Sequence, residues 1–200
     1  MDSRSDTARW ERLMKLLGPI HQQAVATARR LSRSTHDGDD LYQETLIRAH
    51  DKLGGLREES RFRSWFFAVL LSVHRSRVRR PRRESVPIED MVDRREEPVG
   101  DDGTVWDEER RRAERAARAL DTLDPVQQEA VVLHEIEGFS VEEIAEMQHA
   151  TPSAVKSRLA RGREKLRRFY LRHAPVSETR HHEAPTAGTM AWPVKERSHE

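Results

Sequence analysis

The chain has 200 residues, of which 36% are charged and 36% are apolar, and its formal net charge is +1. This length allows one large domain or two small ones, and so polar a composition favours thin helical layers over a thick β-sandwich. The absence of cysteine excludes disulfides and thiolate metal sites. No apolar run approaches the length that crosses a bilayer, and the polar N-terminus lacks the apolar stretch of a signal peptide, so we expect a cytoplasmic protein.

The near-zero net charge hides a basic, acidic, basic pattern along the chain. Residues 74–83 carry six arginines and no acid, whereas residues 84–109 carry eleven acids against two arginines. Residues 156–172 carry eight lysines and arginines against Glu164 alone. Clustered basic residues are the electrostatic footprint of nucleic-acid binding, so the chain has two candidate segments.

Residues 8–82 are predicted to form a helical domain, because apolar residues recur there at three- and four-residue intervals. The spacing that starts at Leu13 continues beyond Gly18 and Pro19 to Leu31. A second helix is predicted to begin near Asp39 and to end at Gly54. It places Leu41, Thr45, Ala49 and Leu53 on one face.

A third helix is predicted from about Phe62 to Arg79, with one apolar stripe made of Phe62, Phe66, Val69 and Val73. Residues 83–107 contain Pro, Gly and many acids without a sustained period, which indicates a flexible acidic linker. Residues 108–172 are predicted to form a second helical domain, and the composition of residues 173–200 is typical of a disordered tail. The predicted fold class is therefore all-α, with two small helical domains.

The second domain carries the clearest helix boundaries. Asp124 before Pro125 and Thr151 before Pro152 are helix starts, Gly138 is a stop, and Ser140 with Glu143 has the spacing of a capping box. Two short helices joined by a tight turn, the second of them basic, are typical of a helix-turn-helix.

The last helix separates its residue types by face. Val155, Leu159, Gly162 and Leu166 fall on one side and are expected to pack inward. Ser153, Ser157 and Arg161 lie opposite them, where they could reach bases and phosphates. A solvated basic face on a helical hairpin is the alternative.

Two stretches together resemble a known family. "LDTLDPVQQEAVVLHEIEGFSVEEIAEMQHATPSAVKSRLARGREKLR" resembles region 4 of the extracytoplasmic-function (ECF) sigma factors, which are small bacterial transcription-initiation factors. "DGDDLYQETLIRAHDKLGGLREESRFRSWFFAVLLSVHRSRVRR" resembles their region 2. Both stretches stand in the family's order and separation, and with the linker they cover nearly all of residues 8–170.

The resemblance implies two partners, core RNA polymerase and promoter DNA. In the family, region 2 binds the coiled coil of the largest polymerase subunit and opens the minus-10 element, while region 4 reads the minus-35 element and touches the flap of the second-largest subunit. Carried over by position, the residues that would face the coiled coil are Asp39, Asp40, Gln43 and Glu44. A solvated acidic helix face remains the alternative for these four.

The loop "GGLREESRFRSW" would lie against the single-stranded non-template strand, since glycines permit a close backbone path and arginines bind phosphates or stack on bases. Phe62 and Phe66 are expected in the core because of their four-residue spacing. Trp65 fits either core packing or base stacking. The residues expected at the minus-10 element are Arg57, Arg61, Arg63, Trp65, Arg75, Arg77, Arg79 and Arg80, and those expected at the minus-35 element are Ser153, Lys156, Ser157, Arg158, Arg161, Arg163 and Arg168.

The chain departs from the family pattern at two places. Ser72 and Ser76 replace the usual Asn and Asp, which leaves the minus-10 base preference open. In the turn, Gln148, His149 and Ala150 replace Leu, Gly and a β-branched residue, so we expect weaker packing there and a left-handed backbone at His149.

The acidic linker has two interpretations. By the resemblance, it threads toward the RNA exit channel of the polymerase and mimics the phosphates that later displace it. The alternative is a solvated spacer that its own charge keeps extended.

No catalytic constellation, cofactor-binding loop or framed metal-ligand set emerges, so we expect a sigma factor that is not an enzyme and uses no cofactor. Whether an anti-sigma protein holds it inactive is left open. The rival hypotheses are a free-standing helix-turn-helix regulator that binds duplex DNA as a dimer, and a chain in which residues 8–81 serve only as a protein-interaction module.

Overall fold

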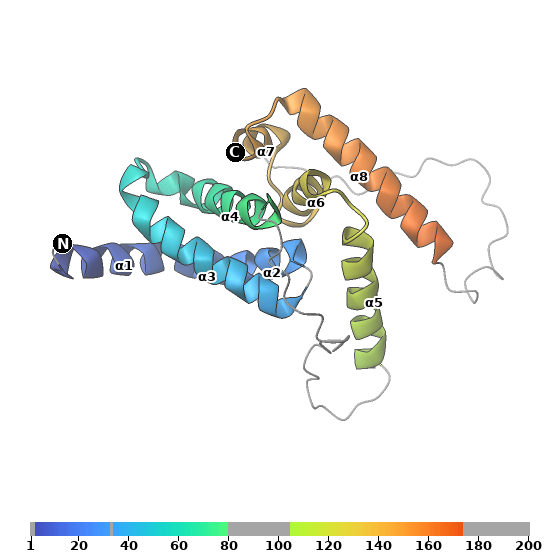
Figure 1. Ribbon diagram of the computed structural model, residues 1–200, viewed down its shortest axis with the longest axis horizontal. Coiled ribbons are helices and arrows are strands. Elements are labelled where there is room, and N and C mark those ends of the chain that lie inside the picture. Colours follow the sequence, from blue (N-terminus) through green and yellow to red (C-terminus); the bar gives the residue numbers. More distant parts are fainter. Residues whose placement is uncertain (1–2, 33, 80–104, 174–200) are drawn as a thin grey trace, which may run out of the picture.

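A computed structural model describes residues 3–32, 34–79 and 105–173 of the chain (Figure 1). Every regular element in these ranges is helical, which confirms the predicted all-α class for the described residues. Most of the predicted linker, the tail beyond His173, and Arg80 lie outside them. The elements are α1 (Ser3–Leu17), η1 (Gly18–Ile20), α2 (His21–Leu31), α3 (Thr35–Lys52), η2 (Leu53–Gly55), η3 (Glu59–Arg61), α4 (Phe62–Arg79), α5 (Val105–Leu120), α6 (Pro125–Val131), the π-helical η4 (Val132–Ile136), α7 (Val141–Gln148) and α8 (Pro152–Arg172).

The N-terminal half, α1 to α4, forms a layer of helices around one apolar core. The predicted stripe of α3 is buried, since Leu41, Thr45, Ala49 and Leu53 are each at most 1% exposed. Phe62 and Phe66 are also buried, which confirms that these two rings belong to the core. The predicted bounds of α4 agree with the structure.

The start of α3 differs from the prediction. The helix begins at Thr35, four residues before Asp39, because the side chain of Ser34 caps it by accepting a hydrogen bond from the backbone N–H of Asp37. Gly38 lies inside this first part of the helix. It is buried against α2, where a Cβ added to it would come within 2.6 Å of the Cα of Arg29.

The caps of the C-terminal half, α5 to α8, agree with the local sequence signals. Ser140 and Glu143 form the predicted capping box at the start of α7. The Thr151 side chain accepts a hydrogen bond from the backbone N–H of Ala154 at the start of α8. Helix α5 starts at Val105, so it includes the last three residues of the predicted linker.

His149 ends α7 in the left-handed conformation, with φ of 48° and ψ of 50°, which confirms the expected geometry of the turn. Among the described residues it is the only non-glycine residue with a positive φ. A Cβ raises the energy of this conformation, so His149 is strained where glycine would not be.

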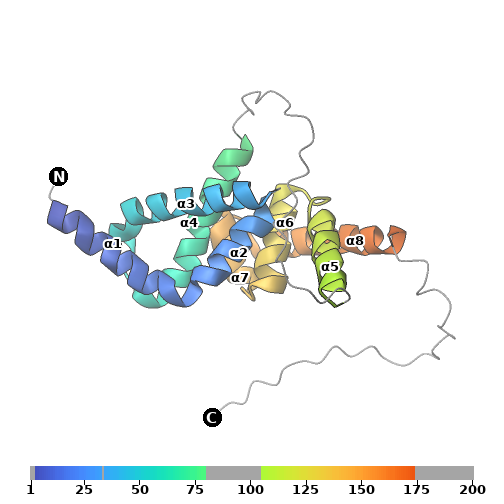
Figure 2. The same ribbon diagram turned by 90° about the horizontal axis from the view of Figure 1, so that it is seen from below.

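The two halves pack against each other in the structure. Helix α4 lies along α7, and α2 lies beside α6, as two perpendicular views show (Figures 1 and 2). The long helix α8 extends from this contact toward α5 and away from α1 (Figure 2). Two domains were predicted from the sequence, but a contact between them was not.

Replacing His149 by glycine should stabilise the protein. Relief of left-handed strain should exceed the added entropy of the unfolded chain, so we expect the free energy of unfolding to rise by about 0.3 to 1 kcal/mol. Urea unfolding followed by circular dichroism measures this. Ala150→Gly is the matched control and should lower the midpoint, because Ala150 does not have a positive φ. A lowered midpoint for His149→Gly would contradict the argument.

Gly38→Ala should destabilise the protein, even though alanine is the better helix former. Its methyl group would overlap the backbone of Arg29, and such overpacking costs about 1 to 3 kcal/mol. Gly54→Ala is the control, since no atom lies within 4 Å of the position its Cβ would take. Thermal unfolding of the two variants should show a fall in Tm for Gly38→Ala only.

Candidate polymerase and nucleic-acid interfaces

The predicted polymerase-binding residues share the outer surface of α3. Gln43 is exposed, and Asp39, Asp40 and Glu44 are half-buried beside it. Arg29 of α2 donates two hydrogen bonds to Asp39, at 2.7 and 3.1 Å. These hydrogen bonds hold the pKa of Asp39 below its usual value, so its charge is retained.

The other two acids also have basic neighbours. Arg48 Nη2 lies 3.1 Å from Glu44 Oε1, one turn away on the same helix. Arg77 of α4 lies 3.7 Å from Asp40 and donates to the backbone oxygen of Asp37. The structure thus brings Arg77, predicted at the minus-10 element, against the acidic face of α3.

The predicted minus-10 residues divide into two groups. Arg57, Arg61 and Arg79 are exposed, and Arg61 pairs with Glu58 in its own loop. Trp65 packs on the core, with its ring centroid 5.8 Å from that of Phe62, and remains partly exposed.

Arg63 and Arg75 instead contact the C-terminal half. The Arg63 guanidinium lies 3.8 Å from the centroid of the Phe139 ring and donates to the backbone oxygen of Glu137 at 2.5 Å. Arg75 Nε lies 3.2 Å from both carboxylate oxygens of Glu129, and its Nη2 donates to the backbone oxygen of Met147 at 3.0 Å.

Glu129 and Glu137 were not predicted as functional residues. The only sequence signal for Glu129 is its position on α6, because Val132 and Leu133, three and four residues later, are both fully buried. A charged residue on the buried face of a helix requires a partner, but the sequence does not identify it.

The predicted minus-35 residues on α8 fall into two groups, exposed residues without an ion-pair partner and residues that bind other side chains. Ser153, Lys156, Ser157 and Arg161 are exposed, and the structure shows no ion pair between Lys156 or Arg161 and another described residue. Their buried counterparts are Val155, Leu159 and Gly162, as predicted, while Leu166 is only partly buried.

Most of the remaining basic residues of α8 form hydrogen bonds or ion pairs. Arg158 donates to the Gln148 side chain at 2.6 Å, and Arg163 pairs with Glu135 at 2.6 Å. Arg167 and Arg168 both donate to Glu164, and these hydrogen bonds lower the pKa of Glu164 to about 2. Among the described residues, the cations of α8 that neither form an ion pair nor donate to another side chain are thus Lys156, Arg161 and Arg172, and the first two lie in the N-terminal half of the helix, the part with which a recognition helix reads bases.

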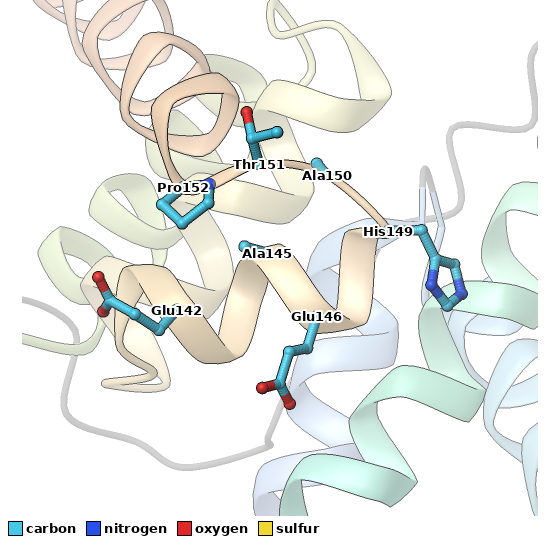
Figure 3. Close-up of a pocket in the computed structure, with 7 residues that line it drawn as sticks. All are labelled: Glu142, Ala145, Glu146, His149, Ala150, Thr151 and Pro152. Atoms are coloured by element: carbon cyan, nitrogen blue, oxygen red, sulfur yellow. The ribbon is translucent and has the colours of Figure 1, made fainter.

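A shallow hollow lies beside the helix-turn-helix turn (Figure 3). Glu142 and Glu146 of α7 line it together with Pro152 at the start of α8. Its two carboxylates make it unsuited to phosphate.

Over the described ranges, no helix has the length and apolar character needed to span a membrane. Within those ranges there is also no group of three metal-ligating side chains.

Two sequence families match the chain, one in each half. Residues 17–84 match the family described as "Sigma-70 region 2", and residues 113–166 match "Sigma-70, region 4". The chain is 32% identical over 150 residues to the ECF RNA polymerase sigma factor SigM of Mycobacterium tuberculosis, covering 74% of this chain and 72% of that protein. It is 33% identical over 181 residues to SigE of Mycolicibacterium smegmatis, covering 89% and 68%.

Solved structures show the same fold. The sigma factor RpoE of Bartonella quintana, in complex with the anti-sigma factor NepR, matches with a TM-score of 0.62 and 26% identity over 80% of this chain and 96% of that one. CnrH in complex with the cytosolic domain of CnrY matches in fold with a TM-score of 0.61 and 23% identity, over 86% of this chain and 96% of that one. The chain therefore belongs to the ECF family of RNA polymerase sigma factors, the proteins that direct RNA polymerase to start transcription at particular promoters.

Proposed function

We propose that this sigma factor binds core RNA polymerase through the outer face of α3 and promoter DNA through α4, the loop before it, and α8. Residues 8–82 then act as region 2, residues 108–172 as region 4, residues 83–107 as a linker, and residues 173–200 as a tail. Because RNA polymerase works on the chromosome, the site of action is the cytoplasm.

The exposure of basic residues on α8 most directly supports recognition of the minus-35 element by this helix. Lys156 and Arg161 are exposed on α8, next to Ser153 and Ser157, while the opposite face of the helix packs on α6. Serine hydroxyls and a guanidinium at the beginning of such a helix can donate to base edges and phosphates in the major groove.

The minus-10 side is supported by charge and exposure. Arg57, Arg61 and Arg79 are exposed and have only local partners among the described residues, where Arg61 pairs with Glu58 and Arg79 donates to the backbone oxygen of Arg75, so they can turn to a phosphate backbone. The exposed part of Trp65 offers a stacking surface for an unpaired base. Arg63 and Arg75 would join them only after leaving Glu137 and Glu129.

An anti-sigma protein is a further expected partner. The Bartonella sigma factor with this fold is in complex with one, and the match covers most of this chain. Such a partner would act by binding, as the sigma factor itself does, since neither carries out covalent chemistry.

Co-elution with core RNA polymerase in the absence of DNA tests the proposal against its rivals. A sigma factor elutes with the polymerase, whereas a free-standing helix-turn-helix dimer or a simple interaction module need not. Sequencing the transcripts that core polymerase starts on genomic fragments, with and without the protein, then identifies the promoters. Absence of both co-elution and new transcript starts would refute the proposal.

The combined change of Gln43→Ala and Glu44→Lys should weaken polymerase binding without unfolding the protein, because both side chains lie at the surface of α3. A pull-down with core polymerase measures binding, and circular dichroism measures folding. The control is Gln22→Ala with Glu11→Lys, which makes the same chemical change at exposed positions of α2 and α1. Equal retention of both variants would remove α3 from the interface.

Arg161→Ala and Arg168→Ala should have different effects on minus-35 binding. If Arg161 reaches a guanine edge, its loss should cost about 1 to 3 kcal/mol at the cognate sequence and relax base preference there. Arg168 anchors phosphate, so its loss should weaken all sequences alike and lower the salt slope by about one. Binding of polymerase holoenzyme to a library of minus-35 variants, at several salt concentrations, measures both effects. An unchanged preference profile for Arg161→Ala would remove its specificity role.

A further inference from the structure

The contact between the two halves has an apolar part and a charged part. The apolar part joins Phe67 of α4 and Phe139, whose rings meet edge to face with centroids 5.1 Å apart. Both rings are at most 1% exposed. The Arg63 guanidinium lies over the Phe139 ring, 3.8 Å from its centroid. Separation of the halves would expose this surface to water.

The charged part is centred on Glu129, whose side chain has no exposed surface. Arg75 Nε lies 3.2 Å from both of its oxygens, His74 Nδ1 lies 3.1 Å from Oε1, and the Gln148 amide donates to Oε2 at 3.1 Å. We refer to these four residues as the Glu129 cluster. Two of its members belong to α4 of the N-terminal half, so separation would remove the cation that faces the carboxylate.

A second buried carboxylate repeats this arrangement at α2. The side chain of Glu137 is 2% exposed. It accepts a hydrogen bond from Thr27 Oγ1 at 2.5 Å and lies 3.4 Å from Arg30 Nη1. In both places the C-terminal half supplies the acid and the N-terminal half supplies a cation, Arg75 for Glu129 and Arg30 for Glu137.

We propose that this arrangement is a closed, self-inhibited form of the sigma factor, in which the C-terminal half occupies arginines that the minus-10 strand requires. Arg75 is bound by the Glu129 carboxylate, and Arg63 by the Glu137 carbonyl and the Phe139 ring. The proposal rests on the proposed function, because it takes these two arginines as promoter contacts. A carboxylate and a phosphate each present a pair of oxygens to a guanidinium in a similar way. A guanidinium bound to one of these two groups is therefore not available to the other.

The charged part also makes the closed form reversible. Attraction in a buried ion pair is largely offset by the loss of hydration of both charges, so such a contact adds little net stability. Once the halves separate, water hydrates Glu129 and Arg75 again. The charged part therefore adds little to the stability of the closed form, and a ligand that binds the open form alone has to overcome mainly the apolar contact of Phe67 and Phe139.

This coupling has a quantitative consequence. If DNA binds only the open form, the apparent affinity is the intrinsic affinity multiplied by the fraction of open molecules. A substitution that raises the open fraction without touching DNA must tighten DNA binding by the same factor. Glu129 meets this condition, because it faces α4 and not the solvent.

Distance measurement between paired spin labels tests the closed form in the full chain. The protein has no cysteine, so labels attach only at two introduced positions, Val78→Cys on α4 and Glu146→Cys on α7, both exposed. Since Arg75 contacts Met147, these labels lie close together when the chain is closed. We expect one short distance in this background, and a longer population increased about tenfold by Glu129→Gln, which loses charge-assisted hydrogen bonds.

Two further variants make the result specific. Thr27→Val removes a donor to Glu137 with little change of shape and should also raise the longer population. Glu108→Gln makes the same chemical change as Glu129→Gln, but Glu108 pairs with Arg112 inside α5 of the C-terminal half, so the distances should stay as in the parent. A parent without the short distance, or folded Glu129→Gln and Thr27→Val variants with unchanged distances, would overturn the closed form. Should Glu129→Gln fail to fold, Thr27→Val alone decides.

Binding of a fluorescein-labelled oligothymidylate strand tests the inhibition. For Glu129→Gln and Thr27→Val, the affinity should rise by the factor by which the open population rises, and for Glu108→Gln it should not change. If the halves separate but the oligothymidylate strand is not bound more tightly, or if no variant binds the strand, the inhibition is refuted while the closed form still holds. Co-elution with core polymerase depends neither on the label distances nor on the oligonucleotide affinity. It therefore shows separately whether the proposed function fails.

Discussion

The carboxylate of Glu129 is buried without any exposed surface, and the helices around it supply the groups that make this tolerable. An unpaired buried carboxylate would be highly unfavourable, so α4, α6 and α7 must be placed such that their donors converge on it. His74 and Arg75 come from α4, and Gln148 comes from the end of α7. The relative position of the two halves and the packing of the helix-turn-helix therefore depend on the same acid.

Gln148 extends this dependence to the recognition helix. Its amide nitrogen donates to Glu129 and to the backbone oxygen of Val126, so its oxygen is left to accept from Arg158 of α8. The substitution of Gln for the Leu usual in the family was expected to weaken packing in the turn. That expectation counted only the lost apolar contact. The structure shows a buried amide with three hydrogen bonds, which a leucine could not make, joining α4 to α8 through Glu129.

Local features of the fold were predictable because their causes lie within a few residues. The capping box of Ser140 and Glu143 and the left-handed turn at His149 follow from short-range chemistry, and the structure has both. The start of α3 was missed because Gly38 weakens the helical pattern, and Ser34 lies before any apolar residue of that helix.

The candidate interfaces were predictable only in part. Periodicity identifies the face of a helix that is buried, but not the element that buries it. Arg63 and Arg75 were thus expected beside DNA, and their contacts lie more than fifty residues away, at Glu137 and Glu129. By resemblance the acid-rich linker was interpreted as a phosphate mimic, whereas the carboxylate that binds Arg75 in the described residues belongs to α6, and Arg63 is bound by the backbone oxygen of Glu137.

An arginine side chain is well suited to binding two different partners one after the other. Its guanidinium remains charged throughout the working pH range and offers planar paired donors to carboxylate and phosphate alike. Arg75 could therefore exchange Glu129 for a phosphate without gaining or losing a proton. The balance between the two states would then depend on the geometry of the contact, on the hydration of the released carboxylate and on ionic strength, since salt weakens the competing DNA phosphates more than a buried pair. Arg75 contacts both Glu129 oxygens through Nε while its Nη2 donates to the backbone oxygen of Met147. A lysine has no planar set of donors, so it could not hold the carboxylate and this carbonyl in the same geometry.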